Sequence, residues 1–213
     1  MPAGPSAADD RMVIGSTREV CGLDTQPAPH GTHGTRRATR PTGQERAFGV
    51  DELIVSKTDQ RGVITYANDV FLRVSGYEMD EVVGRPHNLI RHPDMPRAVF
   101  KLLWDTLSSG RELFAYLNNL AQDGSYYWVL AHVTPSYGPG GRVIGYHSNR
   151  RKPAPRAVQQ IQPLYTRLLA EERRHPNAKA AVAASSQLLT DLVAEQATSY
   201  DELIWAIINR EES

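Results

Sequence analysis

Side chains capable of chemistry gather in the run Gly84–Pro96 (GRPHNLIRHPDMP). This run holds two histidines, two arginines, an asparagine and an aspartate, and it precedes a predicted helix whose first turn carries partial positive charge. Arg91, His92 and this helix end could therefore hold an anionic or electron-rich group. The residue types alone also allow a solvated loop in which Asp94 caps the helix.

Motifs of the common enzyme classes do not occur in the sequence. It contains no Gly-x-x-x-x-Gly-Lys, Gly-x-Gly-x-x-Gly, Gly-x-Ser-x-Gly, His-Glu-x-x-His or Cys-x-x-Cys. The single cysteine, Cys21, falls in a region expected to be a tail, which is a poor place for a nucleophile. We therefore expect a protein that is not an enzyme.

The overall composition narrows the class of protein further. The 24 Lys and Arg residues balance 24 Asp and Glu residues, whereas a general nucleic-acid binder carries a basic excess. A single cysteine cannot form an internal disulfide, and no apolar stretch approaches the roughly 20 residues of a transmembrane helix. The amino terminus also lacks the order of a secretory signal. These features predict a cytoplasmic protein that binds no nucleic acid and does not insert into a membrane.

The elements that must position the run Gly84–Pro96 follow from hydrophobic periodicity. Val50, Leu53 and Val55 begin a strand, and residues 63–66 form its hairpin partner after a turn. Short helices follow, then a longer helix from Pro96 to Gly110. Three further strands are predicted at residues 113–120, 126–135 and 143–148. This order predicts an α+β fold, a five-stranded antiparallel sheet with short helices on one side, which can leave a cavity for a flat ligand.

The two ends of the chain differ from this middle part. Residues 1–46 are poor in large apolar groups and predict a disordered tail, so the folded α+β domain is placed at 47–152. Residues 153–213 predict a helical extension, with Pro163 causing a kink or dividing two abutting helices, and with later helices at 178–194 and 203–209. The extension could pack on the sheet or present a surface to a partner.

Several short motifs resemble those of a PAS domain. They are Asp59-x-x-Gly62-x-Ile64-x-Tyr66-x-Asn68, Ser75-Gly76-Tyr77, Glu81-Val82-Val83-Gly84, Gly124-x-Tyr126-x-Trp128 and Gly145-Tyr146. The loop Pro86–Pro96 resembles more narrowly the flavin-binding PAS domain of bacterial aerotaxis and energy-taxis receptors. Leu113–Tyr116, Trp128 and Arg150–Pro153 look closest to the stand-alone PAS proteins of bipartite energy-taxis systems.

The resemblance implies that FAD occupies the PAS cavity and that its redox state is the signal. Carried over by matched position, Asn68 would lie at the flavin, Arg91, His92 and Asp94 would line its site, and Asn119 would contact the cofactor. Asparagine amides both donate and accept hydrogen bonds, which suits the uracil-like edge of a flavin. From residue type alone, Asn68 could instead cap the next helix and Asn119 could satisfy a strand end.

One position departs from the family. Leu113 stands where the aerotaxis receptor has a tryptophan close to its flavin, which could weaken stacking. Trp104 and Trp128 are interpreted as core residues. His87, His132 and His147 are interpreted as satisfied polar groups or surface residues.

The resemblance also implies a partner, and it leaves rivals open. A stand-alone sensor would signal by protein contact to a membrane-bound chemotaxis-type receptor or another transducer, and a homodimer is possible. The alternatives are a haem-binding gas sensor that uses His92 or His87, and a PAS interaction module without a cofactor. A light sensor that forms a flavin–cysteine adduct is disfavoured because the predicted domain contains no cysteine.

Overall fold

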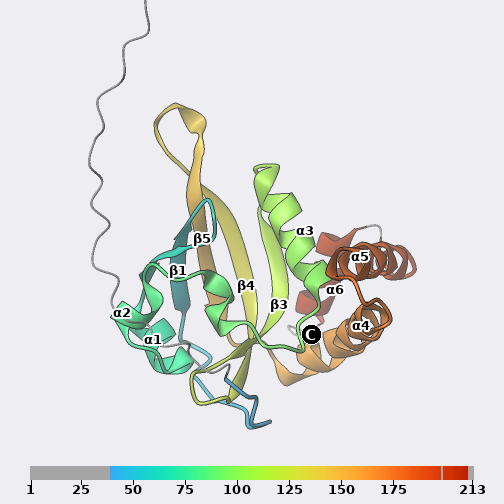
Figure 1. The fold of residues 1–213 in the computed structure, drawn as a ribbon, viewed down its shortest axis with the longest axis horizontal. Helices are drawn as coiled ribbons and strands as arrows, with labels where there is room; N and C mark the ends of the chain where they lie inside the picture. Colours follow the sequence, from blue (N-terminus) through green and yellow to red (C-terminus); the bar gives the residue numbers. More distant parts are fainter. Residues whose placement is uncertain (1–38, 198, 211–213) are drawn as a thin grey trace, which may run out of the picture. The chain divides into compact units, whose positions relative to one another are not determined.

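A five-stranded antiparallel sheet forms the centre of the computed structural model, which describes residues 39–197 and 199–210. The strand order is β2-β1-β5-β4-β3. The strands are β1 (Ile54–Asp59), β2 (Ile64–Ala67), β3 (Leu113–Leu120), β4 (Tyr126–Tyr137) and β5 (Val143–Arg151). The predicted α+β fold is confirmed (Figure 1). Val50 and Leu53, expected within the first strand, precede β1 and are exposed.

Short helices on one side of the sheet precede a longer one, and three more follow the last strand. They are α1 (Asp69–Ser75), α2 (Met79–Val82), the 3-10 turn η1 (His87–Ile90), α3 (Arg97–Ser108), the 3-10 turn η2 (Pro139–Gly141), α4 (Pro155–Arg173), α5 (Ala178–Ala194) and α6 (Tyr200–Asn209). Helix α1 ends where Gly76 adopts φ 74°, a left-handed conformation that closes a helix without a Cβ clash.

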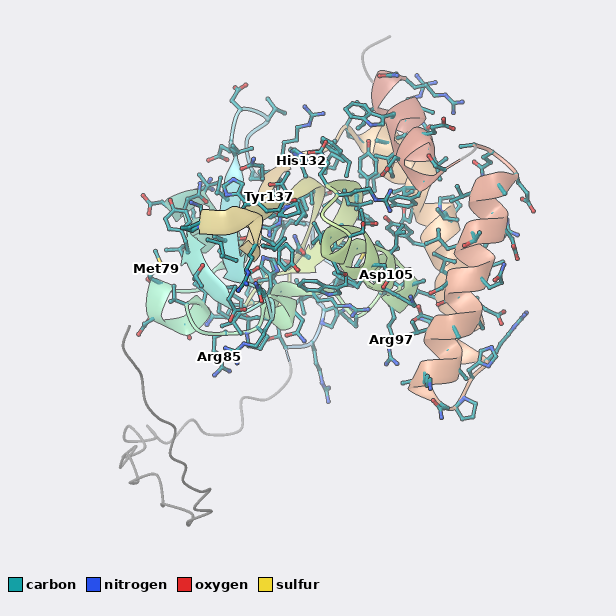
Figure 2. All side chains as sticks on the ribbon, turned by 90° about the horizontal axis from the view of Figure 1, so that it is seen from above. Met79, Arg85, Arg97, Asp105, His132 and Tyr137 are labelled. Carbon is teal, nitrogen blue, oxygen red and sulfur yellow. The ribbon has the colours of Figure 1, made fainter. Side chains whose placement is uncertain are left out.

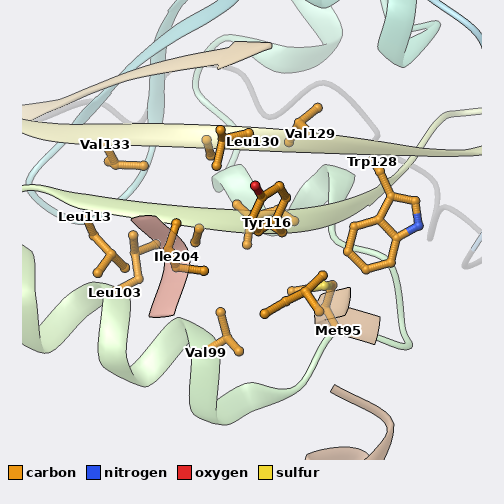
Figure 3. Close-up of a cluster of buried hydrophobic side chains, with 14 of the residues drawn as sticks. Met95, Val99, Leu103, Leu113, Tyr116, Trp128, Val129, Leu130, Val133 and Ile204 are labelled. Carbon is orange, nitrogen blue, oxygen red and sulfur yellow. The ribbon is translucent and has the colours of Figure 1, made fainter. Parts of the chain in front are cut away.

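The hydrophobic core lies between α3 and strands β3 and β4. Met95, Val99 and Leu103 project from the α3 side toward Leu113 and Val133 on the strands (Figure 3). Each fully buried side chain of this size contributes about 1.5–3 kcal/mol through the hydrophobic effect. The core therefore fixes α3 against one half of the sheet.

Strand β5 is the central strand, and its register with β1 decides which polar residues meet. Ser56 pairs with Ser148, and Ile54 pairs with Arg150. Because side chains alternate across a strand, Tyr146, Ser148 and Arg150 share one face of β5, the face that Ser56 and Thr58 share on β1.

The C-terminal helices pack on their own domain. Helix α5 contacts α3, α6 contacts β3, and the Tyr165 hydroxyl of α4 donates a 2.7 Å hydrogen bond to the Tyr116 carbonyl of β3. Figure 2 shows Arg97, at the start of α3, on the side of the sheet where these helices lie and Met79 of α2 on the opposite side. Of the two alternatives for the extension, the structure shows packing on the sheet edge.

Helix α4 runs through Pro163 without dividing in two. The proline removes one backbone donor, but it is exposed, and Ile161, Leu164 and Leu168 form a continuous buried stripe on the other face. The prediction of two abutting helices is therefore wrong, because packing of this stripe outweighs one lost hydrogen bond.

Residues 39–46, which the sequence analysis places in the tail, lie beside the start of β4. The Thr42 amide donates to the Gly124 carbonyl at 2.8 Å, and the Arg46 amide donates to the Tyr126 carbonyl at 2.7 Å. The Arg46 guanidinium also pairs with Asp123. The rest of the predicted tail, residues 1–38, lies outside the described residues, and the domain boundaries stay a prediction.

None of the helices in the described ranges combines the length and the apolar run that crossing a bilayer requires.

Candidate functional site

A cavity of about 330 Å³ opens between the sheet and the helices that cover it. Its walls come from β1, β5, the ends of β3 and β4, the turn η1 and one face of α3. Its volume is at the small end of the range for ligand pockets, roughly 300–1,000 Å³.

Buried polar atoms without a hydrogen-bond partner are concentrated in this cavity. In the described part of the chain seven buried side-chain atoms lack a partner, and four of them belong to cavity residues: Thr58 Oγ1, Asn119 Nδ2, Ser148 Oγ and Arg150 Nη1. An unsatisfied buried polar group costs about 1–3 kcal/mol. Such a concentration of unmade hydrogen bonds indicates a site for a polar ligand. Because Asn119 Nδ2 and Arg150 Nη1 are hydrogen-bond donors, this ligand must offer acceptors.

Arg150 lies at the wall that β1 and β5 form. Its Nη2 donates to Ser56 Oγ at 2.8 Å and to His87 Nε2 at 2.6 Å, and its side chain faces the ring of Phe71. Burial lowers the pKa of Arg150 to about 10, so the guanidinium keeps its charge at neutral pH.

His87 is held neutral by this neighbour. Burial and the Arg150 charge lower the pKa of His87 well below its usual value. Because Nε2 accepts the arginine hydrogen, the ring proton is assigned to Nδ1. The interpretation of His87 as a satisfied polar group agrees with these bonds, but the sequence did not reveal that it lines the cavity.

Aromatic side chains border the cavity at the α3 side. Trp104 meets Tyr146 edge to face, with ring centroids 5.4 Å apart. Trp104 is 39% exposed, so its interpretation as a core residue is wrong. A Cβ added to Gly62 would lie 2.9 Å from the Trp104 ring, so the glycine in the β1–β2 turn, at φ 76°, makes room for it.

Arg91 and Asn119, two of the predicted site residues, are brought together at the cavity. Their backbones form an isolated antiparallel bridge, which fixes the loop after η1 to the end of β3. The Arg91 guanidinium lies 4.1 Å from the centre of the Phe100 ring and donates to the Met95 carbonyl at 2.8 Å. Asn119 is 5% exposed. Both line the cavity.

The other three predicted residues do not line it. Asn68 caps α1, because its side-chain oxygen accepts from the Phe71 backbone amide. The same oxygen also accepts from the Val55 amide, and the Asn68 side-chain nitrogen donates to the Leu53 carbonyl. His92 is buried, and its Nδ1 accepts from the Asp94 amide at 3.1 Å. Burial lowers the pKa of His92, and the charge of Asp94 opposes this shift.

Asp94 points away from the cavity and does not cap α3. Its carboxylate is largely exposed and lies 3.6 Å from the Arg173 guanidinium of α4. The cap position belongs to Pro96, and the first amides of α3, from Arg97 and Ala98, donate instead to Glu172 Oε1 at 2.7 and 3.2 Å. The loop Pro86–Pro96 thus contacts the cavity at one end and α4 at the other.

Leu113, the position where the family has an aromatic residue, lies in the core. It is 2% exposed and belongs to the cluster with Leu103, and it is not among the cavity residues. Arg150 was missed as a site residue although the motif Arg150–Pro153 was recognised. Strand alternation from Tyr146 through Ser148 was the signal that could have placed it on the inner face.

The sheet order, the helices over one face and a family model together define the class of this domain. The family model, described as PAS fold, matches residues 64–150. The chain therefore contains a PAS domain, as the sequence motifs predicted.

The comparisons then relate this PAS domain to particular sensors. The chain is 39% identical over 127 residues to the aerotaxis receptor of Escherichia coli, covering 60% of this chain and 25% of that receptor. It is 33% identical over 99 residues to the nitrogen fixation regulatory protein of Klebsiella pneumoniae, covering 46% and 20%. The chain thus spans a quarter or less of these relatives. The LOV domain of the blue-light photoreceptor Aureochrome1 has 26% identity and a TM-score of 0.47, over 52% of this chain and 88% of that one.

Proposed function

We propose that this chain is a cytoplasmic redox sensor that binds FAD through its PAS cavity and signals by protein contact. The observation that carries the proposal is a set of four unpartnered buried polar atoms, all on residues that line one cavity with an aromatic border. The similarity to an aerotaxis receptor supports the same class of signal.

The residues present fit the ring of a flavin. A bound flavin would supply a ring that accepts and releases electrons. Asn119 Nδ2 and Arg150 Nη1 would donate to its oxygen and nitrogen acceptors, while Ser148 and Thr58 offer hydroxyls that donate or accept. Trp104 and Tyr146 would exclude water from the ring. Arg91, beside Phe100, would close the cavity on the loop side.

Haem fits the described residues less well. An axial histidine must offer a free ring nitrogen toward the iron. The Nε2 of His87 already accepts from Arg150, and His92 does not line the cavity. In a PAS module without a cofactor, the four buried polar atoms on the cavity residues would have only water as a hydrogen-bond partner.

A flavin–cysteine adduct is also disfavoured. The sequence has one cysteine, Cys21, and none of the described cavity residues is a cysteine. In this proposal the chain is a sensor and not an enzyme, and redox change of the flavin is the input.

The output would pass to a membrane-bound chemotaxis-type receptor or another transducer. The path argued from this chain runs through the loop Pro86–Pro96, because Arg91 lines the cavity while Glu172 of α4 binds the first amides of α3. A change in the cavity would alter this loop and with it the C-terminal helices. A partner responds only if it binds the two resulting states with different affinity.

The first test is the visible absorption spectrum of the full chain purified in air, followed by chromatography of any released cofactor. A two-banded flavin spectrum with released FAD is the expected result. An intense Soret band would identify haem, and not flavin, as the cofactor. A colourless protein that added FAD, FMN or riboflavin does not restore would refute the flavin proposal.

A further inference from the structure

Arg150 is a buried cation that no described carboxylate neutralises. It is 3% exposed, and it forms no ion pair with an Asp or Glu in the described ranges. Its Nη2 is satisfied by two neutral acceptors, Ser56 and His87, whereas Nη1 has no partner. Burying a charge without a counter-charge is unfavourable, so such residues are retained where a ligand supplies the missing charge.

The charges of the residues that line the cavity also favour a ligand that supplies negative charge. Three arginines line it (Arg61, Arg91 and Arg150), and no Asp or Glu is among its described lining residues. Arg61 is largely exposed and pairs with Asp59 outside the cavity, so its charge is compensated. Arg91 is partly exposed beside Phe100. Arg150 is therefore the buried, uncompensated positive charge that a ligand would meet.

We propose that Arg150 holds the negative charge that the flavin ring gains on reduction, and so makes the cavity prefer the reduced ring. The inference rests on the proposed function. On reduction the ring takes two electrons from an added reductant and one proton from water, and it thereby gains one negative charge. With dithionite as reductant, the sulfur is oxidised to sulfite and the remaining protons go to solvent.

The position of Arg150 favours the ring over a cofactor phosphate as the source of that charge. It lies with Ser148 on the central strand β5, next to Ser56 of the paired strand β1, at the wall that a flat ring would reach. A phosphate is strongly hydrated and suits the exposed side of the cavity, where Arg61 lies. Because Nη2 is fixed by two bonds, Nη1 keeps one orientation and needs no reorganisation when the charge appears.

The test compares the midpoint potential of bound FAD in the wild-type full chain, Arg150→Gln and Arg150→Met. Gln can still donate a hydrogen bond to Ser56 or His87 but carries no charge. Met removes both the hydrogen bond and the charge. The matched control is Arg151→Met, the same change at the adjacent, exposed residue of β5. We expect both Arg150 variants to lose at least tenfold in preference for reduced over oxidised flavin, a fall of about 30 mV for a two-electron couple. Arg151→Met should keep the wild-type potential.

Two further measurements separate this role from a structural one. Thermal unfolding of the unliganded Arg150→Gln variant should occur within a few degrees of wild type, since the removed charge was unpaired and Gln keeps a hydrogen bond to Ser56 or His87. Arg150→Met, which leaves both acceptors without this donor, should unfold at a lower temperature. Affinity for oxidised riboflavin, which has no phosphate, should change less than the affinity for its reduced form.

Unchanged potentials in flavin-loaded Arg150 variants would overturn the inference about Arg150 and leave the proposed function standing. A loss of FAD and FMN binding with riboflavin binding intact would overturn the ring assignment in favour of a phosphate. A wild-type chain that binds no flavin would overturn the proposed function itself.

Discussion

Asn68 and Asn119 are the same residue type in opposite situations. Every hydrogen bond that fixes Asn68 is made within the protein, to Phe71, Val55 and Leu53. The Asn119 amide nitrogen is buried with no partner in the described part of the chain, and the residue lines the cavity. The first arrangement stabilises the fold, and the second is available to a ligand.

Substituting each asparagine by alanine should therefore separate stability from binding. Asn68→Ala should lower the free energy of unfolding by at least about 1 kcal/mol, the usual contribution of a helix cap. Asn119→Ala should leave unfolding nearly unchanged and weaken flavin binding up to about tenfold, the effect of one net hydrogen bond. Thermal unfolding of the unliganded chain and fluorescence titration with FAD measure the two effects. Equal flavin affinity in both variants would remove Asn119 from the site.

His87 gives the fold a dependence on pH. Its pKa in the folded chain is lowered by burial and Arg150, so above about pH 6.5, the unfolded value, its contribution is complete. As the pH falls below that value, the unfolded chain binds a proton that the folded chain resists, and stability is lost.

The unfolding temperature of the unliganded chain should thus fall as the pH is lowered from 7.5 to 5.5. His87→Gln, which keeps an acceptor for Arg150, should show a shallower fall. The comparison needs only thermal unfolding at matched ionic strength. A slope as steep in the variant as in wild type would assign the effect to His92, whose pKa is also lowered by burial.

At the scale of elements, the contact between α4 and α3 replaces a missing helix cap. Pro96 offers no capping side chain, so the first amides of α3 bond to Glu172, which also accepts from Ser185 of α5. A carboxylate at a helix amino terminus is also favoured by the helix dipole. One side chain therefore joins three helices.

Glu172→Gln keeps an oxygen acceptor but removes the charge, so it should destabilise the chain by about 0.3–2 kcal/mol, the range for a carboxylate at a helix amino terminus. Glu171→Gln is the matched control, because Glu171 pairs only within its own helix turn, with Arg174 and His175. Exposed pairs of this kind contribute at most about 1 kcal/mol. Urea unfolding of both variants measures the difference. A larger loss in Glu171→Gln would show that the α3–α4 contact is minor.

The elements themselves were predictable, and their meeting points were not. The strands predicted at residues 113–120 and 143–148 and the helix after Pro96 follow from local periodicity, turns and caps, although β5 continues to Arg151. Ser56 and Arg150 are 94 positions apart and meet only through the register of β1 with β5. Such register depends on the packing of the whole sheet, which no local pattern contains. For the same reason Asp94, predicted at the cofactor, lies on the α4 side of its loop, and His92 packs beside Tyr126 and does not line the cavity.

At the scale of the whole molecule, redox change in the cavity should be visible on the C-terminal helices. Hydrogen exchange in the FAD-loaded full chain should differ between oxidised and reduced states at the first turn of α3 and in α4 and α5. In Glu172→Gln the difference should persist at α3 and shrink in α4 and α5, because the connecting carboxylate is lost. Identical exchange in both redox states would mean that the loop Pro86–Pro96 transmits nothing.

The hydrogen bond from Tyr165 to the Tyr116 carbonyl also has a consequence for assembly. Strand β3 is the last strand of the sheet, so its outer backbone groups would be open to an extended chain wherever nothing covered them. The loop at Arg91 and His92 pairs with the end of β3, Tyr165 of α4 bonds the Tyr116 carbonyl, and α6 packs on the strand, so these contacts keep a foreign strand from adding to it. Loosening of α4 and α6 would expose the part of the β3 edge that they cover and make it a template for β-augmentation. The packing of these helices within the chain would then control whether β3 pairs with another chain.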